Sequence, residues 1–248
     1  MKFSIVTPSF NQGQYIEQTI KSVLDQNYPD LEYFVLDGGS TDNTVDIIKK
    51  YGRFIKWRSR RDKGQVAAIN EGLNKSTGDI IAYVNSDDYY LPGSFQAVAD
   101  YFAAHPDTLW LYGDCAVTDP KLKWTFFLKK LWPVHKYQFA LKIFNTINQP
   151  AVFLRKSLVK KVGLLNPAYH YAFDYDYWLR CLQHSLPAKI PNNLTVFRVH
   201  PSSLGSTSFH RQFSEDLEII QNYSRNPLII LVHLIGSLTV KLVYNLLK

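Results

Sequence analysis

The chain has 248 residues, of which 46% are hydrophobic and 20% charged, and it carries a formal net charge of +7. It can bury a full core, as one large domain or as a domain with an appendage. Cys115 and Cys181 lack metal or redox spacing, so we expect reduced core residues. The basic excess fits a phosphate-bearing ligand, an anionic membrane surface or nucleic acid. The first apolar run, 3–6, is too short for a signal peptide, and we expect the protein on the cytoplasmic side.

The first hundred residues alternate predicted strands with predicted helices. The pattern predicts strands at 3–7, 31–36, 54–57 and 80–84, and helices at 14–26, 41–50, from 64 onward, and 94–104. This alternation indicates βαβ units, and therefore an α/β fold with a mostly parallel sheet. Carboxyl ends of successive parallel strands should converge at one edge of that sheet.

Acidic residues follow two of these strands. The apolar run 80–84 ends in Asn85-Ser86-Asp87-Asp88, and the strand at 31–36 ends in Asp37. Carboxylates at the carboxyl ends of core strands lie where open α/β sheets bind ligands, and Mg²⁺ or Mn²⁺ is held by one or two carboxylates plus substrate phosphates. The alternative is a solvated acidic turn. The chain lacks Gly-x-Gly-x-x-Gly and a P-loop, which disfavours a dinucleotide dehydrogenase or a P-loop kinase.

The second half predicts a strand at 109–112, an extended segment at 148–155 and a short helix capped by Ser157. A helix that begins near Asp174 should bury Tyr177, Trp178, Cys181 and Leu182, and a strand should span 195–200. Residues 121–142 contain six lysines between aromatic residues and no acidic residue. This segment is either a basic loop packed on the domain or a contact for lipid headgroups or a lipid-linked acceptor.

The C-terminal stretch 228–247 is largely apolar, but His233, Ser237, Lys241 and Asn245 recur every four residues. Such a polar stripe is typical of an amphipathic helix in the plane of a membrane interface. A helix packed on the domain or in a dimer, and a spanning helix, are the alternatives. We therefore predict two parts, 1–208 as the main domain and 209–248 as a helical appendage.

Taken together, these stretches resemble the family 2 glycosyltransferases with the GT-A fold, over roughly 2–208. The resemblance lies in five motifs in order: Thr7-Pro8-Ser9-Phe10-Asn11, Asp37-Gly38-Gly39-Ser40-Thr41-Asp42, Asp62-Lys63-Gly64-Gln65, Asn85-Ser86-Asp87-Asp88 and Phe173-Asp174-Tyr175-Asp176-Tyr177-Trp178-Leu179-Arg180. Three features depart from the family pattern. The strand before Asp62 is unusually rich in arginine, with Arg58, Arg60 and Arg61. Asn85 stands where many members carry the first Asp of the metal motif, and Phe173 stands where Glu is common.

The resemblance implies a role for each motif. The expected nucleotide-sugar contacts are Thr7, Pro8, Ser9, Asp37, Asp62, Gln65, Asn85 and Asp87, with Asp37 reaching the base and Asp87 the ribose or the metal. Asp88, which we expect in a surface loop, would bind a divalent metal, Mn²⁺ or Mg²⁺, on the diphosphate, and His200 would contact the diphosphate or the metal. Asp174 matches the general base that deprotonates the acceptor hydroxyl.

The implied activity is transfer of a sugar from a nucleotide-diphosphate sugar to a hydroxyl of a glycan or lipid-linked acceptor, in envelope polysaccharide or glycolipid synthesis. One base without a second nucleophile implies inversion at the anomeric carbon. The rival hypotheses are a metal-dependent nucleotidyltransferase and a non-enzymatic basic module that binds membrane or nucleic acid. The sequence contains no nucleic-acid-binding motif, so we expect no nucleic-acid partner. We do expect a peripheral position on the cytoplasmic face of the membrane.

Overall fold

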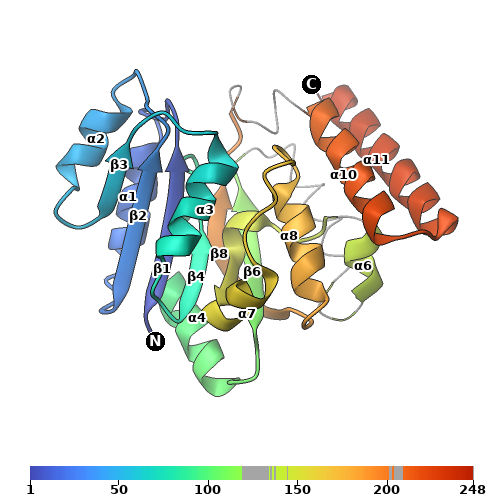
Figure 1. Cartoon of the computed structure of the whole chain (residues 1–248), viewed down its shortest axis with the longest axis horizontal. Helices are drawn as coiled ribbons and strands as arrows, with labels where there is room; N and C mark the ends of the chain where they lie inside the picture. Colours follow the sequence, from blue (N-terminus) through green and yellow to red (C-terminus); the bar gives the residue numbers. More distant parts are fainter. Residues whose placement is uncertain are drawn as a thin grey trace.

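The computed structural model describes residues 1–118, 134, 136, 138–143, 145–200, 203 and 209–247. Within them, one sheet has the strand order β3-β2-β1-β4-β7-β6-β8-β5 (Figure 1). The strands are β1 (Phe3–Ser9), β2 (Leu31–Asp37), β3 (Lys56–Ser59), β4 (Ile80–Tyr83), β5 (Tyr89–Tyr90), β6 (Trp110–Val117), β7 (Val152–Arg155) and β8 (Ala188–Phe197). Most of the predicted basic segment, 121–133, lies outside the described residues.

The sheet is mostly parallel, as predicted. Strands β3, β2, β1 and β4 are parallel, β7 runs antiparallel to both β4 and β6, and β8 is parallel to β6. The carboxyl ends of β1, β2, β4, β6 and β8 therefore lie at one edge. The chain runs from β1 outward to β3 and then returns to place β4 on the other side of β1. This reversal is the topological switch point at which open α/β sheets bind ligands.

Helices cover both faces of the sheet (Figure 1). They are α1 (Ile16–Leu24), α2 (Thr44–Lys50), α3 (Gln65–Lys75), α4 (Ser94–Ala104), α6 (Gln138–Ile143), η2 (Gln149–Ala151), α7 (Lys156–Val162), α8 (Phe173–Leu182), α10 (Phe209–Tyr223) and α11 (Pro227–Leu247). One apolar cluster joins the sheet to α1, α2 and α4, and a second joins it to α3, α7, α8 and α10. Both cysteines are free and buried, as expected.

Several local predictions differ from the structure. The strand predicted at 195–200 is the end of β8, which spans Ala188–Phe197 and stops before His200. The third strand begins at Lys56 rather than at Phe54, whose side chain is exposed. Helix α2 begins after Asn43, because the hydroxyl of Ser40 donates a hydrogen bond to Asp37 instead of capping the helix. Ser157 lies inside α7 rather than at its cap.

The two C-terminal helices lie side by side next to α8 and α6 (Figure 1). Ile219 and Ile220 of α10 are fully buried in the core cluster that includes α8. On α11, His233 and Ser237 of the predicted polar stripe face inward and are buried. The side chains of Lys241 and Asn245 lie outside the described residues. The predicted division at 208 stays a prediction.

Among the described residues, no helix combines the length and the apolar character needed to cross a bilayer.

Candidate active site

The loops that follow β1 and β2 form one hydrogen-bonded unit. The Gly38 N–H donates to the Ser9 carbonyl (2.8 Å), and Asn11 accepts from the Thr41 N–H (2.9 Å). The Asn11 N–H in turn donates to the Ser40 hydroxyl (2.7 Å). These bonds position the two strand ends against each other at the switch point.

Asp37 shapes this unit. Its carboxylate is fully buried and accepts hydrogen bonds from the N–H groups of Gly39 (3.0 Å) and Ser40 (2.9 Å) and from the hydroxyls of Ser40 and Ser59. Gly39 adopts a φ of 86°, a backbone conformation that favours glycine. A Cβ at this position would also meet the backbone of Arg61 at 3.0 Å. Both carboxylate oxygens thus bond within the loop, and the predicted contact of Asp37 with a base stays a prediction.

The first motif places its two hydroxyls differently. Thr7 is fully buried and its hydroxyl lies 3.0 Å from the Tyr33 hydroxyl, within the sheet. Pro8 is also buried, opposite Leu36 in β2. The Ser9 hydroxyl is buried without a hydrogen-bond partner among the described residues. Because buried polar groups are nearly always hydrogen-bonded, Ser9 is the member of this motif that has an unfilled bond to offer a ligand.

Arg58 joins the loops after β2 and β3 to α3, and it was not among the predicted site residues. Its guanidinium donates to the Asp37 carbonyl, to Asp62 (3.0 Å) and to Glu71 (2.8 Å). Burial acts to raise the pKa of Glu71, but hydrogen bonds from Arg58 and Lys75 outweigh it and lower that pKa to about 2. The Asp62 carboxylate also accepts from the Gly64 N–H (2.9 Å), at the start of α3. The Arg-rich strand was visible in the sequence, but its partners were not.

A chain of side-chain amides crosses the switch point. Gln65 donates to the Asn85 oxygen (2.7 Å), Asn85 approaches the Gln149 oxygen (3.4 Å), and Gln149 donates to the Tyr83 carbonyl (2.7 Å). The Gln65 oxygen is buried without a partner in the described part of the chain. Gln149 was not among the predicted site residues. Its position in the polar stretch Asn148-Gln149-Pro150, just before β7, is the sequence feature that could have indicated it. The chain links the two predicted donor residues to β7.

Asp87 and His200 meet at the end of β4. Asp87 Oδ2 lies 3.0 Å from His200 Nε2, and the imidazole packs on the Tyr15 ring at 4.4 Å. Arg198, two residues before His200, lies over the rings of Tyr15 and Tyr89. The structure therefore brings together two residues that are 113 positions apart in sequence.

Asp88 lies elsewhere than expected. Its side chain is fully buried rather than at the surface, and one oxygen accepts a hydrogen bond from the Arg198 N–H (2.8 Å). The other oxygen, Oδ2, is buried without a partner among the described residues, like the Ser9 hydroxyl. Burial, with the neighbouring charge of Asp87, raises the pKa of Asp88 well above its ordinary value. The expectation of a surface position is wrong, because the turn after β4 buries the Asp88 side chain against the segment that follows β8. Asp88 binds the segment after β8 to the end of β4.

The Asp87–His200 pair suits a divalent ion. A carboxylate oxygen and an imidazole nitrogen are both ligands of Mn²⁺, and such ions take their remaining ligands from phosphates and water. No group of three or more His, Cys, Asp or Glu side chains gathers to hold a metal among the described residues. Two protein ligands fit an ion that arrives with a diphosphate, rather than one held by the protein alone.

Asp174 lies in the first turn of α8. One carboxylate oxygen accepts from the Tyr175 N–H (2.8 Å), and the other lies 3.4 Å from the Asn145 amide nitrogen. Burial, and then the charge of Asp174, raises the pKa of the Tyr83 phenol well above its ordinary value. Asp174 is half-buried, so a hydroxyl can approach its carboxylate. As predicted, Tyr177, Trp178, Cys181 and Leu182 of this helix are buried.

Asp176 faces another side of the same helix. Its carboxylate pairs with Arg180 (2.9 Å) and accepts from the Tyr223 hydroxyl of α10 (3.0 Å). It therefore ties α8 to α10.

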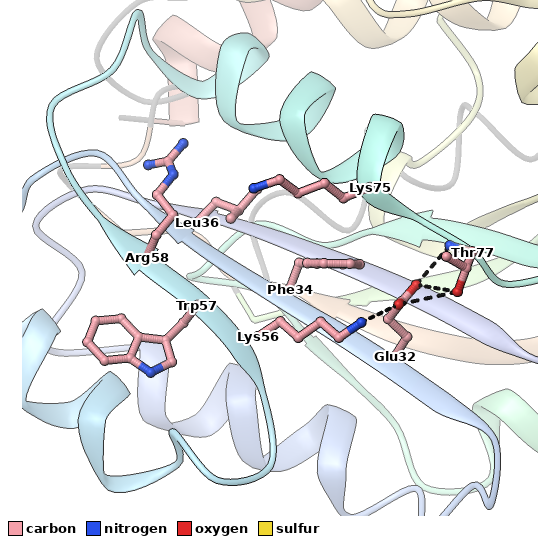
Figure 2. Close-up of a pocket in the computed structure, with 8 residues that line it drawn as sticks. All are labelled: Glu32, Phe34, Leu36, Lys56, Trp57, Arg58, Lys75 and Thr77. Carbon is pink, nitrogen blue, oxygen red and sulfur yellow. Dashed lines mark hydrogen bonds and ion pairs between the residues drawn. The ribbon is translucent and has the colours of Figure 1, made fainter.

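A groove of about 410 Å³ lies at the edge of the sheet along β2 and β3 (Figure 2). Its basic side chains are each paired with a carboxylate: Lys56 with Glu32, and Arg58 and Lys75 with Glu71. Trp57 points to the opposite side of β3 from Lys56 (Figure 2). Because these charges are already neutralised, the groove is a poorer site for a diphosphate than the switch point.

Sequence comparison identifies a family. The family described as glycosyl transferase family 2 matches residues 4–162. An uncharacterized glycosyltransferase of Rickettsia typhi is 26% identical over 84% of this chain and 67% of its own length. A PGL/p-HBAD biosynthesis glycosyltransferase of Mycobacterium bovis is 27% identical over 83% of this chain and 78% of its own.

Solved structures share the fold. Staphylococcus aureus TarS in complex with UDP-GlcNAc superposes with a TM-score of 0.71 at 18% identity, over 89% of this chain and 65% of that one. This chain spans 39% of a longer TarS chain. The mannosyltransferase PcManGT of Pyrobaculum calidifontis, in complex with GDP-Man and Mn²⁺, gives 0.68 at 15% identity, over 96% and 74%. These neighbours confirm the predicted GT-A fold.

Proposed function

The chain belongs to glycosyl transferase family 2, and from this premise we propose that it transfers a sugar from a nucleotide-diphosphate sugar to a hydroxyl with inversion of configuration. The observation that carries the proposal is the arrangement at the switch point. Donor-side groups at the ends of β1, β2 and β4 face a metal-type pair, Asp87 and His200, while Asp174 stands at the start of α8. The family excludes the non-enzymatic alternative.

The donor half of the proposal concerns the nucleotide. Ser9 and Gln65 each hold a buried oxygen without a partner among the described residues, and both lie beside the strand ends where a nucleotide would bind. In this proposal Asp37 and Asp62 maintain the loop shape, and Asn85 orients Gln65. TarS and PcManGT, of similar fold, are in complex with UDP-GlcNAc and GDP-Man, which supports a donor of this class.

The diphosphate end is assigned to Asp87 and His200. The Asp87 carboxylate and the His200 imidazole would hold Mn²⁺ or Mg²⁺ together with the diphosphate oxygens. Such an ion supplies positive charge that stabilises the departing nucleoside diphosphate. Arg198 holds this pair in place, since its backbone bonds Asp88 and its guanidinium packs on Tyr15. The metal role expected of Asp88 passes to Asp87 in this proposal.

The acceptor half depends on Asp174. Its carboxylate takes the proton of the attacking hydroxyl, and the Asn145 amide and the Tyr175 N–H hold it in orientation. Attack from the face opposite the leaving diphosphate inverts the anomeric carbon, because one carboxylate acts as base without a covalent intermediate. We propose a glycan or a lipid-linked molecule as the acceptor, in cell-envelope synthesis, and the name of the mycobacterial relative supports that direction.

The test is product analysis with a panel of nucleotide sugars and Mn²⁺. A donor that binds the folded state raises the melting temperature, and we expect turnover of that donor to release a nucleoside diphosphate. A nucleotidyltransferase acting on the same donor would instead transfer the nucleoside monophosphate and release a sugar 1-phosphate. Stabilisation by no nucleotide sugar, or release of a sugar 1-phosphate, would contradict the proposal.

A further inference from the structure

Helix α11 buries polar side chains and exposes aliphatic ones. On its inner side, His233 and Ser237 are 3% and 8% exposed. Six aliphatic side chains, between 36% and 68% exposed, form what we call the outer face: Leu228, Leu231, Val232, Leu234, Ile235 and Leu238. A helix on the surface of a water-soluble domain shows the opposite order, because burying apolar side chains is what stabilises its packing. The outer face therefore needs an apolar partner.

Specific contacts fix this orientation. His233 Nδ1 donates to the Ile143 carbonyl of α6 (2.6 Å), and its ring stacks near Tyr175 of α8, with centroids 6.5 Å apart and planes within 8°. Burial lowers the pKa of His233, which favours the neutral imidazole. Rotating α11 to hide the outer face would break this bond and expose α6. The packing of α11 on α6 and α8 therefore holds these aliphatic side chains in their outward orientation.

We propose that the outer face binds the surface of an anionic lipid bilayer, with α11 in the plane of the membrane. The charge distribution favours lipid over a second copy of the chain. Residues 219–248 contain Arg225, Lys241 and Lys248 but no Asp or Glu, and the whole chain carries +7. Anionic lipids attract such a segment, whereas two copies would bring like charges together.

The size of the outer face points the same way. Six partly exposed aliphatic side chains make a patch on the order of a few hundred Å². A stable protein–protein interface buries roughly 800 Å² on each partner. The patch is therefore small for a dimer but sufficient for shallow insertion at the headgroup boundary, where apolar burial and charge act together.

The bound membrane would lie on the acceptor side of the site. His233 of α11 bonds Ile143, and Asn145, two residues further on, contacts Asp174. An acceptor whose hydroxyl is attached to a membrane lipid would thus be held near the carboxylate that we assign as base. This choice of acceptor rests on the proposed function, while binding of the bilayer does not.

The test is co-sedimentation with phosphatidylcholine vesicles that contain phosphatidylglycerol, without any substrate. We expect the wild-type protein to bind these vesicles and not pure phosphatidylcholine. The triple variant Leu231→Gln, Ile235→Gln, Leu238→Gln should bind about 100-fold more weakly. The matched control replaces three exposed apolar residues elsewhere, Phe54→Gln, Leu164→Gln and Leu186→Gln, and should bind like wild type. Arg225→Gln should weaken binding by about fivefold.

Two results would overturn the proposal. One is a wild-type protein that stays in the supernatant, or an outer-face variant with unchanged binding and an unchanged melting temperature. The other is light scattering that shows a wild-type dimer and a monomeric outer-face variant, which would assign the face to a second copy. Donor hydrolysis without vesicles reports on the transferase itself, so its failure is distinguishable from failure of membrane binding.

Discussion

The donor region and the acceptor region each contain two neighbouring aspartates, and the members of each pair differ in what they contact. Asp87 faces His200, whereas Asp88 is buried and bonds the backbone after β8. Asp174 is half-buried at the start of α8, whereas Asp176 ties that helix to α10. In each region the more exposed aspartate is the one to which we assign a role in the proposed function, and the buried one links two elements of the fold. Two carboxylates close in sequence thus differ in the contacts they make.

The largest expected effect separates the members of the acceptor pair. Asp174→Asn should lower the transfer rate by about 10²–10⁴-fold, because it removes a general base, and should leave donor affinity unchanged. Asp176→Asn should keep most activity but lower the melting temperature, since it weakens the pair with Arg180. Steady-state rates and nucleoside diphosphate calorimetry measure both. Near wild-type transfer by the Asp174 variant would place the base elsewhere.

A buried carboxylate far from both pairs provides a purely structural reference. Burial of Glu32 acts to raise its pKa, but bonds from Lys56, Thr77 and Ser4 outweigh it and lower that pKa from 4.5 to about 2. The folded state thus favours the ionised form, which contributes up to about 3 kcal/mol above pH 4.5 and loses it as the pH falls towards 2.

In Glu32→Gln, the unfolding free energy should be lower at pH 7 and should fall less steeply between pH 4.5 and 2. Urea denaturation across that range measures the slope. An acid limb as steep as that of wild type would show that other carboxylates carry it.

Substitutions of Asp87 and Asp88 should differ in their effect on metal-dependent nucleotide binding. Asp87→Asn should weaken Mn²⁺-dependent binding of a nucleoside diphosphate by about 10- to 100-fold, because a charged metal ligand becomes a neutral amide. Asp88→Asn keeps the oxygen that accepts from the Arg198 N–H and should bind normally. Calorimetry with and without Mn²⁺ makes the comparison. The reverse result would restore Asp88 as the metal ligand.

The smallest effect tests how the donor loops are held. Arg58→Gln should weaken donor affinity by about 3- to 10-fold with little change in maximal rate, since it releases Asp62 and the Asp37 loop from α3. Arg60→Gln, at an exposed arginine 3.4 Å from the same Glu71, is the control and should change neither. Arg58→Lys should recover part of the affinity. A fall in maximal rate with unchanged affinity would contradict this role.

Much of the fold could be predicted because strand and helix patterns are local. The apolar run Ile80–Tyr83 predicted a core strand, and every one of its residues is buried. Helix α4 begins and ends as predicted. The start of β3 could not be predicted, because Phe54 looks apolar locally yet lies in an exposed turn. On α11 the polar stripe was visible, but the face that packs on α6 is decided by a partner distant in sequence.

The sequence predicted which segments contribute to the candidate site, but not which side-chain atoms contact one another there. The motifs placed Asp37, Asp87 and Asp174 near strand or helix ends, where the structure has them. Which of two adjacent aspartates turns inward depends on the backbone path after β4. The Arg58–Asp37 contact spans 21 positions and the Gln149–Asn85 contact 64, and periodicity carries no information on such pairs.

The antiparallel direction of β7 has a consequence for how such a chain can diversify. Because Tyr112 of β6 pairs antiparallel with Val152 of β7, the end of β6 and the start of β7 lie at the same edge of the sheet, the edge of the proposed donor site. The length of the segment between these strands can therefore change without shifting the register of the strands. Each doubling of a flexible loop costs only about 0.6 kcal/mol in closure entropy. In the function that we propose, insertions and replacements between β6 and β7 would change the acceptor side and leave the strand ends of β1, β2 and β4 as they are.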